Sequence, residues 1–224
     1  MRRLLALMVG FHLLVANSAA VPLGLFIAGD QHSSYQAIPD WLYTLSVTWK
    51  QFKQEHPKGV FLLVIPGDFT GANSGTTVFP PGTPLKSDHG RLGYDVLAHL
   101  GNMLDIVLVP GNHDQFDWED IGADLFIEHH SELAHVINEN RESPHRLGKF
   151  TTLAANIVPG QDGKGLFAPF SDFQLGEKRV RFVGGVLDVF YDKSNCKRNG
   201  TLIQDVRPMA DVAIEQLDQA VKSG

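Results

Sequence analysis

Cysteine is almost absent from this chain of 224 residues, because Cys196 is the only one. A single thiol excludes an intrachain disulfide. An excess of basic residues is also lacking: the formal net charge is −6, which argues against a general nucleic-acid binder, since such a protein needs a basic face. The motifs Gly-x-Ser-x-Gly and Gly-x4-Gly-Lys-[Ser/Thr] are missing too, so a serine hydrolase or a P-loop nucleotide binder has no support.

The N-terminus has the layout of a cleavable signal peptide over residues 1–20. Two arginines precede an apolar stretch at residues 4–15, and small residues follow at positions 18–20. The stretch is shorter than the roughly 20 residues that span a bilayer comfortably, so we expect no stable membrane span. We therefore expect export, to a periplasm or outside the cell. An uncleaved anchor or a buried first strand is the alternative.

Three apolar runs, each typical of a buried strand, end in short polar clusters. They are residues 25–28 before Gly29-Asp30-Gln31-His32, residues 61–65 before Pro66-Gly67-Asp68, and residues 106–109 before Pro110-Gly111-Asn112-His113-Asp114. In an open α/β sheet the carboxyl ends of such strands meet at one crevice. We therefore expect these polar side chains to come together there.

The spacing of apolar residues predicts a layered α/β fold that begins β-α-β-α-β. Strands are expected at residues 23–28, 60–65 and 105–109, and helices at residues 39–56 and 91–100. A further helix is expected at residues 118–140, with a break near His130, and strands at residues 150–157, 170–175 and 179–186, the last two as a hairpin about Gly176 and Glu177. A terminal amphipathic helix is expected at residues 209–221, with Val212, Ile214, Leu217 and Val221 facing inward.

The polar clusters contain the side chains of a metal site. Asp30 and His32 are two residues apart, so in an extended segment both can reach one cation. Asp68 has two carboxylate oxygens and can bridge two ions, and Asn112 offers an amide oxygen. Each motif alone is usually a solvated turn. Together they predict oxygen and nitrogen ligands for divalent ions rather than for metals that prefer thiolates.

These clusters resemble the calcineurin-like metallophosphoesterases, whose pattern is D-x-H, then G-D, then G-N-H-[DE]. Residues 111–118 and 150–157 are most similar to the 5'-nucleotidase branch. The resemblance implies a four-layer α-β-β-α sandwich and two divalent metal ions (Mn, Zn, Fe or Co). It also implies that Asp30 and His32 bind the first ion, Asp68 bridges, and Asn112 binds the second. The implied activity is hydrolysis of a small phosphorylated substrate, such as a nucleotide, by hydroxide formed from a water shared between the metals.

The resemblance places His113 off the metals, as a proton donor to the leaving oxygen or a stabiliser of charge on the phosphoryl group. Such a histidine needs a carboxylate to fix its tautomer. In the 5'-nucleotidase branch this carboxylate follows three residues after the histidine, where this chain has Phe116. Asp117, one residue later, is favoured as the partner, and Asp114 is the alternative. The remaining histidines, including the pair His129 and His130, are expected to be surface or structural, although that pair could bind adventitious metal.

The family pattern also contains a later Gly-His and a Gly-His-x-His, but no histidine follows His145 in this chain. We therefore expect residues 21–224 to be a partial metallophosphoesterase domain, truncated at the C-terminus, with a missing C-terminal segment, an exposed sheet edge and impaired activity. The alternative is a catalytically inactive protein that keeps the front half of the fold as a binding or interaction module.

Overall fold

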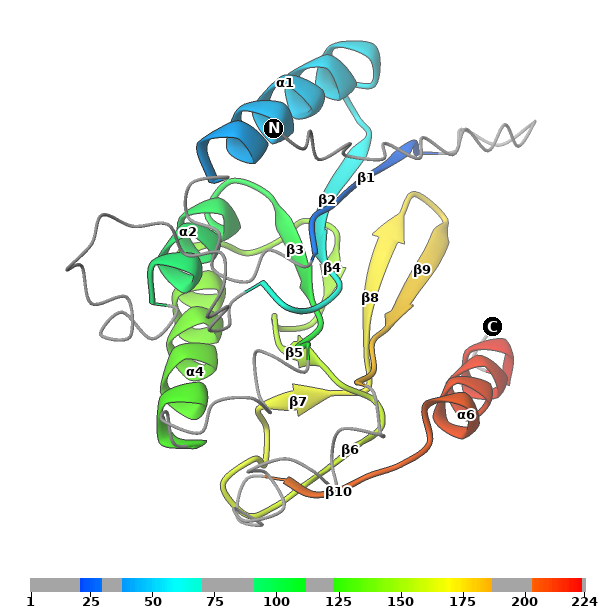
Figure 1. Ribbon diagram of the computed structural model, residues 1–224. Helices are drawn as coiled ribbons and strands as arrows, with labels where there is room; N and C mark the ends of the chain where they lie inside the picture. The colour runs from blue at the N-terminus through cyan, green and yellow to red at the C-terminus, as the bar shows by residue number, and fades with distance from the viewer. Residues whose placement is uncertain (1–20, 30–37, 70–90, 112–122, 187–202, 223–224) are drawn as a thin grey trace, which may run out of the picture.

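The computed structural model describes residues 21–29, 38–69, 91–111, 123–186 and 203–222. The first half of the chain forms a parallel sheet in the order β1-β2-β3 (Figure 1). Its strands are β1 (Leu23–Ile27), β2 (Val60–Ile65) and β3 (Asp105–Leu108). Helices α1 (Ile38–Glu55) and α2 (Arg91–Gly101) lie between them in sequence, which confirms the predicted β-α-β-α-β order.

The three strands differ in burial. Nearly every residue of β2 and β3 is buried, as expected for continuous apolar runs covered on both faces. The edge strand β1 is more open than predicted, because Leu25 is 45% and Ile27 is 63% exposed. Both lie on the face that the second sheet covers over β2 and β3 but leaves partly uncovered at β1. A sequence pattern shows that a strand is apolar, but it does not show whether that strand lies at the edge.

Helices cover one face of the parallel sheet. Besides α1 and α2, this layer includes α4 (Ala123–Asn140), which runs beside α2 (Figure 1). The core between helices and sheet contains Leu45, Leu63, Ile65, Leu97, Ile106, Leu133 and Ile137. The predicted break of α4 near His130 is wrong: the helix is continuous there, and it contains neither proline nor glycine. Residues 118–122 of the predicted helix lie outside the described residues.

A second sheet faces the first. It has the antiparallel order β4-β8-β9, with β4 (Arg146–Leu147), β8 (Phe170–Leu175) and β9 (Lys178–Val183). The predicted hairpin is confirmed, and Gly176 adopts the left-handed φ of 64° at its turn. Between the sheets lie Val60, Leu62, Val107, Leu153, Phe173 and Leu175. This second core packs the antiparallel sheet against β2 and β3 of the parallel sheet.

The strand predicted over residues 150–157 is wrong, because two short strands occur there instead. β5 (Thr152–Leu153) pairs in parallel with β7 (Phe167–Ala168), and β6 (Ile157–Pro159) pairs antiparallel with β10 (Ile203–Val206). A turn separates them, in which the Ile157 amide donates to the Ala154 carbonyl at 3.2 Å. The strand predicted to reach Val186 ends at Val183, because Gly184 and Gly185 leave the ladder.

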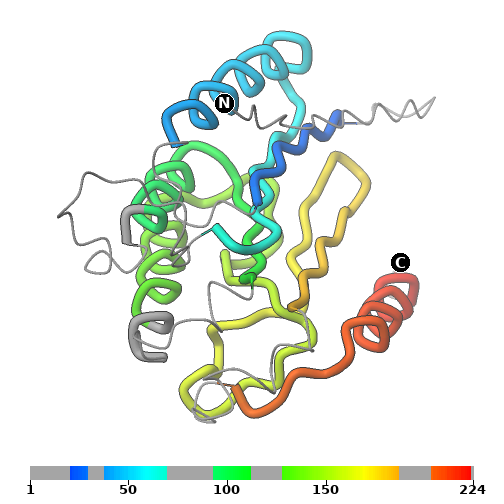
Figure 2. Tube along the Cα trace, viewed as in Figure 1, coloured from blue at the N-terminus to red at the C-terminus, as the bar shows by residue number. Residues whose placement is uncertain are grey.

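The last helix, α6 (Met209–Lys222), lies beyond β9 as the outermost layer, and Figure 2 traces the chain into it from β10. Its bounds agree with the prediction within a residue, but its orientation does not. Val212 and Gln216 are buried, whereas Ile214, Leu217 and Val221 are 62%, 66% and 74% exposed. At the start of the helix Met209 contacts Gly185, and Glu215 forms an exposed ion pair with Arg207.

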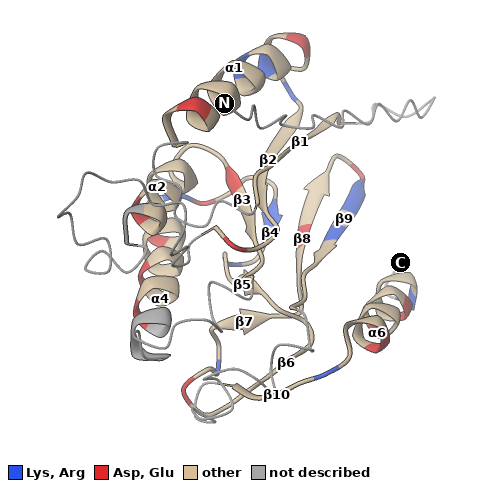
Figure 3. Cartoon of the chain, viewed as in Figure 1, with Lys and Arg blue, Asp and Glu red and all other residues tan. Residues whose placement is uncertain are grey.

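A buried ion pair ties the two sheets together at β3. Asp105 begins β3 and lies 3.4 Å from the guanidinium of Arg146, which also donates to the Ile106 carbonyl at 3.0 Å. The Ser143 hydroxyl donates to the same carboxylate at 2.8 Å. Figure 3 shows the acidic start of β3 beside the basic strand β4. Because burial without partners is costly for a charge, this network fixes the position of β3.

The described layers follow the order helices, parallel sheet, antiparallel sheet, helix. This mixed α/β arrangement agrees with the four-layer α-β-β-α sandwich implied by the resemblance. No helix among the described residues is long and apolar enough to cross a membrane.

Candidate metal centre

The carboxyl ends of the three parallel strands are aligned with one another. Ile27 pairs with Val64, and Ile65 pairs with Leu108. The pairing continues one residue further at each edge, because the Ala28 amide donates to Val64 at 2.9 Å and the Val109 amide donates to Ile65 at 2.8 Å. The three polar clusters of the sequence therefore begin at the same edge of the sheet.

Glycines allow the three corners after the strands to approach closely. A methyl group added to Gly29 would lie 2.7 Å from Cγ of Pro66, and one added to Gly67 would lie 2.9 Å from the Cα of Gly111. Gly67 also has a φ of 125°, a conformation that side chains disfavour. Side chains at these positions would force the strand ends apart. The Gly-Asp and Gly-Asn pairs thus reflect close packing of backbone at this edge.

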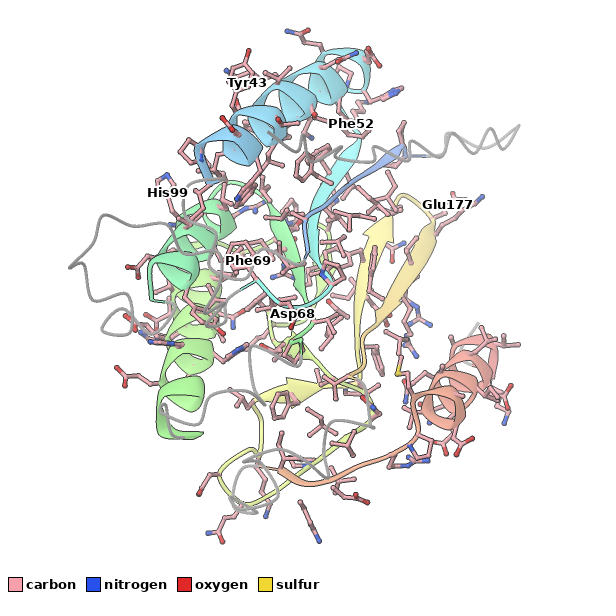
Figure 4. The ribbon with its side chains drawn as sticks, in the orientation of Figure 1. Tyr43, Phe52, Asp68, Phe69, His99 and Glu177 are labelled. Atoms are coloured by element: carbon pink, nitrogen blue, oxygen red, sulfur yellow. The ribbon has the colours of Figure 1, made fainter. Side chains whose placement is uncertain are left out.

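Asp68 lies at the centre of these corners. Its φ of 49° is left-handed, a region that aspartate tolerates better than most residues. A methyl group added to Gly111 would overlap both the Asp68 carboxylate and the Asp68 backbone nitrogen. Phe69, the next residue, is buried and packs edge-on against Trp41 of α1 at 6.0 Å, and Figure 4 shows Asp68 and Phe69 at this end of the sheet. The core therefore anchors the corner that presents Asp68.

The other predicted site residues lie outside the described residues. They are Asp30, His32, Asn112, His113, Asp114 and Asp117. Each belongs to a segment that directly follows a described corner, at Gly29 or at Gly111. Within the described part of the chain, no group of three or more histidine, cysteine, aspartate or glutamate residues could hold a metal ion.

The described part of the corner fits a hard divalent cation in the chemistry of its donor group. Asp68 supplies carboxylate oxygens, the ligand type that such ions prefer. The absence of a side chain at Gly111 lets the backbone approach that carboxylate closely, and the absence of one at Gly67 lets the Asp68 corner approach the Gly111 backbone. Of the predicted ligands, Asp68 is the one whose surroundings the structure describes.

His130 of α4 is structural, as expected, because both of its ring nitrogens have hydrogen-bond partners and neither is left for an adventitious metal. Its Nε2 lies 2.8 Å from the Tyr94 hydroxyl, and its Nδ1 lies 2.7 Å from the Thr152 hydroxyl. His129 is also buried, and its ring lies tilted against the ring of Tyr94, with centroids 5.0 Å apart. Burial, followed by the nearby His129, lowers the pKa of His130 to about 3. This neutral imidazole links α2, α4 and β5.

The lowered pKa of His130 predicts acid sensitivity of the fold. A histidine with a depressed folded-state pKa contributes full stability above its ordinary value of 6.5 and loses that stability as the pH falls towards 3. With a slope of about 1.4 kcal/mol per pH unit, about 2 kcal/mol is lost between pH 6.5 and pH 5. Urea unfolding at several pH values measures this loss. His130→Gln cannot be protonated, so its free energy of unfolding should fall by about 2 kcal/mol less between pH 6.5 and pH 5 than that of the unmodified protein. An equal loss of stability in both proteins would contradict a lowered pKa of His130.

Asn156 lies within residues 150–157, which carry part of the family resemblance, and the structure gives it a role. It is fully buried, and its side chain binds the backbone of Val186 and Arg207. A lone asparagine near a strand end carries no spacing signal that would have revealed this. The same is true of the Asp105–Arg146 pair, whose members are 41 positions apart.

A mixed α/β sandwich whose parallel strands end at a cramped, carboxylate-bearing corner is typical of enzymes that bind ligands at the carboxyl ends of strands. The family model for the calcineurin-like phosphoesterases matches residues 25–201. The chain therefore belongs to that family, which implies metal-dependent hydrolysis of phosphoesters. No curated protein matches the chain.

Proposed function

We propose that this protein is a phosphomonoesterase of the 5'-nucleotidase type that acts at a dinuclear metal centre. The observation that carries the proposal is the contact between Asp68 and Gly111, because it joins the second polar cluster to the third at one corner. Asp30 and His32 would hold one ion and Asn112 the other, with Asp68 shared between them. When bound, the two ions supply charge stabilisation and an activated water.

The chain's own residues have separate tasks in this proposal. Asp68 would hold the two ions together, because a carboxylate has two oxygens to offer. His113 donates a proton to the leaving oxygen of the substrate, and Asp117, or alternatively Asp114, holds its imidazole in the required tautomer. Similarity of residues 111–118 and 150–157 to the 5'-nucleotidase branch supports a nucleotide as substrate.

His113→Ala is expected to lower the turnover number about 10²- to 10⁴-fold, the usual contribution of a general acid, while the metal content stays the same. The measurements are hydrolysis of a chromogenic phosphomonoester and elemental analysis of the purified protein. Loss of the ions from His113→Ala would make this histidine a ligand instead of a proton donor.

We further propose that the imidazoles absent after His145 come from a segment outside residues 21–224. The exposed apolar side chains of the edge strand, Leu25 and Ile27, support a docking place for additional chain beside β1. Residues 21–224 alone are then expected to bind divalent ions weakly and to hydrolyse phosphate esters poorly, because four protein ligands serve two ions. Supplying such a segment should restore turnover. Full activity of residues 21–224 with Mn²⁺, Zn²⁺ or Co²⁺ would contradict this.

Export is proposed on the layout of residues 1–20, which has the charged, apolar and small-residue regions of a signal peptide. N-terminal sequencing of protein recovered from the periplasm or the medium is expected to begin at Val21. Exported protein that still begins with Met1 would contradict cleavage.

A further inference from the structure

Asn156 makes an unusually complete set of hydrogen bonds for a residue outside any strand. Its Oδ1 accepts the Val186 amide at 2.9 Å, and its Nδ2 donates to the Val186 carbonyl at 2.7 Å. The same Nδ2 donates to the Arg207 carbonyl at 3.0 Å, and the Asn156 carbonyl accepts the Arg207 amide at 2.8 Å. The side chain thus pairs with both backbone groups of Val186, as a neighbouring strand would, and joins three segments of the chain.

Val186 ends a short segment that follows β9, residues 184–186, here called the β9 extension. This extension lies against the end of β3. The Ala155 amide donates to the Gly184 carbonyl at 2.8 Å, and a methyl group on Gly184 would lie 2.6 Å from Cγ2 of Val109 and 2.8 Å from Cβ of Leu153. The β9 extension has no ladder partner, and its backbone is held by hydrogen bonds to Asn156 and Ala155, beside the contact of Gly185 with Met209 and the packing of Val186 in an apolar cluster.

Val109 connects this contact to the candidate metal centre. Its amide donates to Ile65 at 2.8 Å, and the chain then passes through Pro110 to Gly111, which lies against the Asp68 carboxylate. A continuous series of contacts therefore leads from Asn156 through the β9 extension to the corner that carries Asp68. Packed backbone transmits small displacements along such a series because the interior is dense.

We propose that Asn156 is a positioning residue for the metal centre: it holds the β9 extension against Val109 and so fixes the corner at Gly111 and Asp68. This inference rests on the proposed metal-binding function. Asparagine alone suits the position, because aspartate lacks both donors and would bury a charge, and alanine would leave the Val186 amide and two carbonyls without this partner.

The test compares Mn²⁺ affinity of the purified chain by calorimetry, well below the unfolding transition of each variant. Asn156→Ala is expected to bind Mn²⁺ about tenfold more weakly. This is the smaller end of the loss of metal affinity that usually follows removal of a group that orients metal ligands. The chain offers a matched control in Asn138, whose side chain pairs in the same two-point manner with Phe150, at 2.7 Å and 3.0 Å, on the helical side of the sheet. Asn138→Ala should lose stability but keep its affinity.

Gly184→Ala disturbs the same contact between the β9 extension and Val109 directly, because the added methyl group would press on Val109 and Leu153. Gly184→Ala should weaken Mn²⁺ binding as Asn156→Ala does. If Asn156→Ala fails to fold, Gly184→Ala is compared with Asn138→Ala in its place. Because the chain alone is expected to bind Mn²⁺ weakly, the titration is carried to high Mn²⁺ concentration. If the unmodified chain shows no binding even there, the proposed function is wrong. If the unmodified chain binds Mn²⁺ and the Asn156 and Gly184 variants bind it as tightly as Asn138→Ala does, Asn156 is merely structural and this inference is overturned.

Discussion

Asp68→Asn is expected to abolish both metal binding and phosphatase turnover while the fold persists. An amide is neutral and can offer only one oxygen, so it cannot hold two cations together. The fold should tolerate the change, because asparagine has nearly the same shape and accepts the left-handed φ of 49° that Asp68 adopts. Phe69, buried against Trp41, should keep the corner anchored in the variant.

The measurements for Asp68→Asn are metal content, Mn²⁺ affinity and thermal unfolding without added metal. Asp218→Asn is the matched control, since it removes the same charge from an exposed position on α6. Only the Asp68 variant should lose its metal, and the unfolding free energies should agree within about 0.5 kcal/mol. If Asp68→Asn retains its ions, Asp68 is not a ligand.

Gly111→Ala is expected to reduce turnover and Mn²⁺ binding nearly as much as Asp68→Asn does, although Gly111 has no side chain that could bind a metal. The added methyl group would overlap the Asp68 carboxylate and its backbone nitrogen, so the two corners must separate. A displacement of about 1 Å at a reacting group can reduce activity about 100-fold. We therefore expect turnover to fall by about this factor, together with weaker binding of Mn²⁺.

Gly148→Ala controls for the general effect of replacing a glycine. Gly148 has a φ of 104°, so alanine there is strained, but no heavy atom lies within 4 Å of the added methyl group. Stability should fall in this variant without a change in Mn²⁺ affinity. A Gly111→Ala variant that binds Mn²⁺ normally would show that the contact with Asp68 does not shape the site.

The sequence predicts the parallel sheet well because β2 is an apolar run between Gly59 and Pro66, and β3 is an apolar run from Ile106 that ends before Pro110. It predicts the hairpin of β8 and β9 for a similar reason, since Gly176 and Glu177 interrupt two alternating runs. Less was predictable where long-range contacts decide the outcome. The exposure of Leu25 depends on where the second sheet ends, and the exposure of Ile214 depends on which face of α6 packs against the rest of the chain.

For the candidate site, the sequence identifies the order of the polar clusters, and the sheet shows why they begin at one edge. Three features of the corner were not visible in the sequence. They are the left-handed backbone of Asp68, its contact with Gly111, and the support that the β9 extension gives to Val109. Each arises from backbone segments far apart in the chain. Residue spacing alone therefore indicates the chemistry of the corner but not the packing that holds it.

The most direct test of the account is the position of a bound metal ion. Anomalous diffraction from crystals of the chain grown with Mn²⁺ should show density at the carboxyl ends of β1, β2 and β3, about 2 Å from a carboxylate oxygen of Asp68, the distance usual for a metal–carboxylate bond. Crystals of Asp68→Asn grown in the same way should lack it. Density elsewhere, or equal density in both crystals, would contradict the claim that Asp68 is the central ligand.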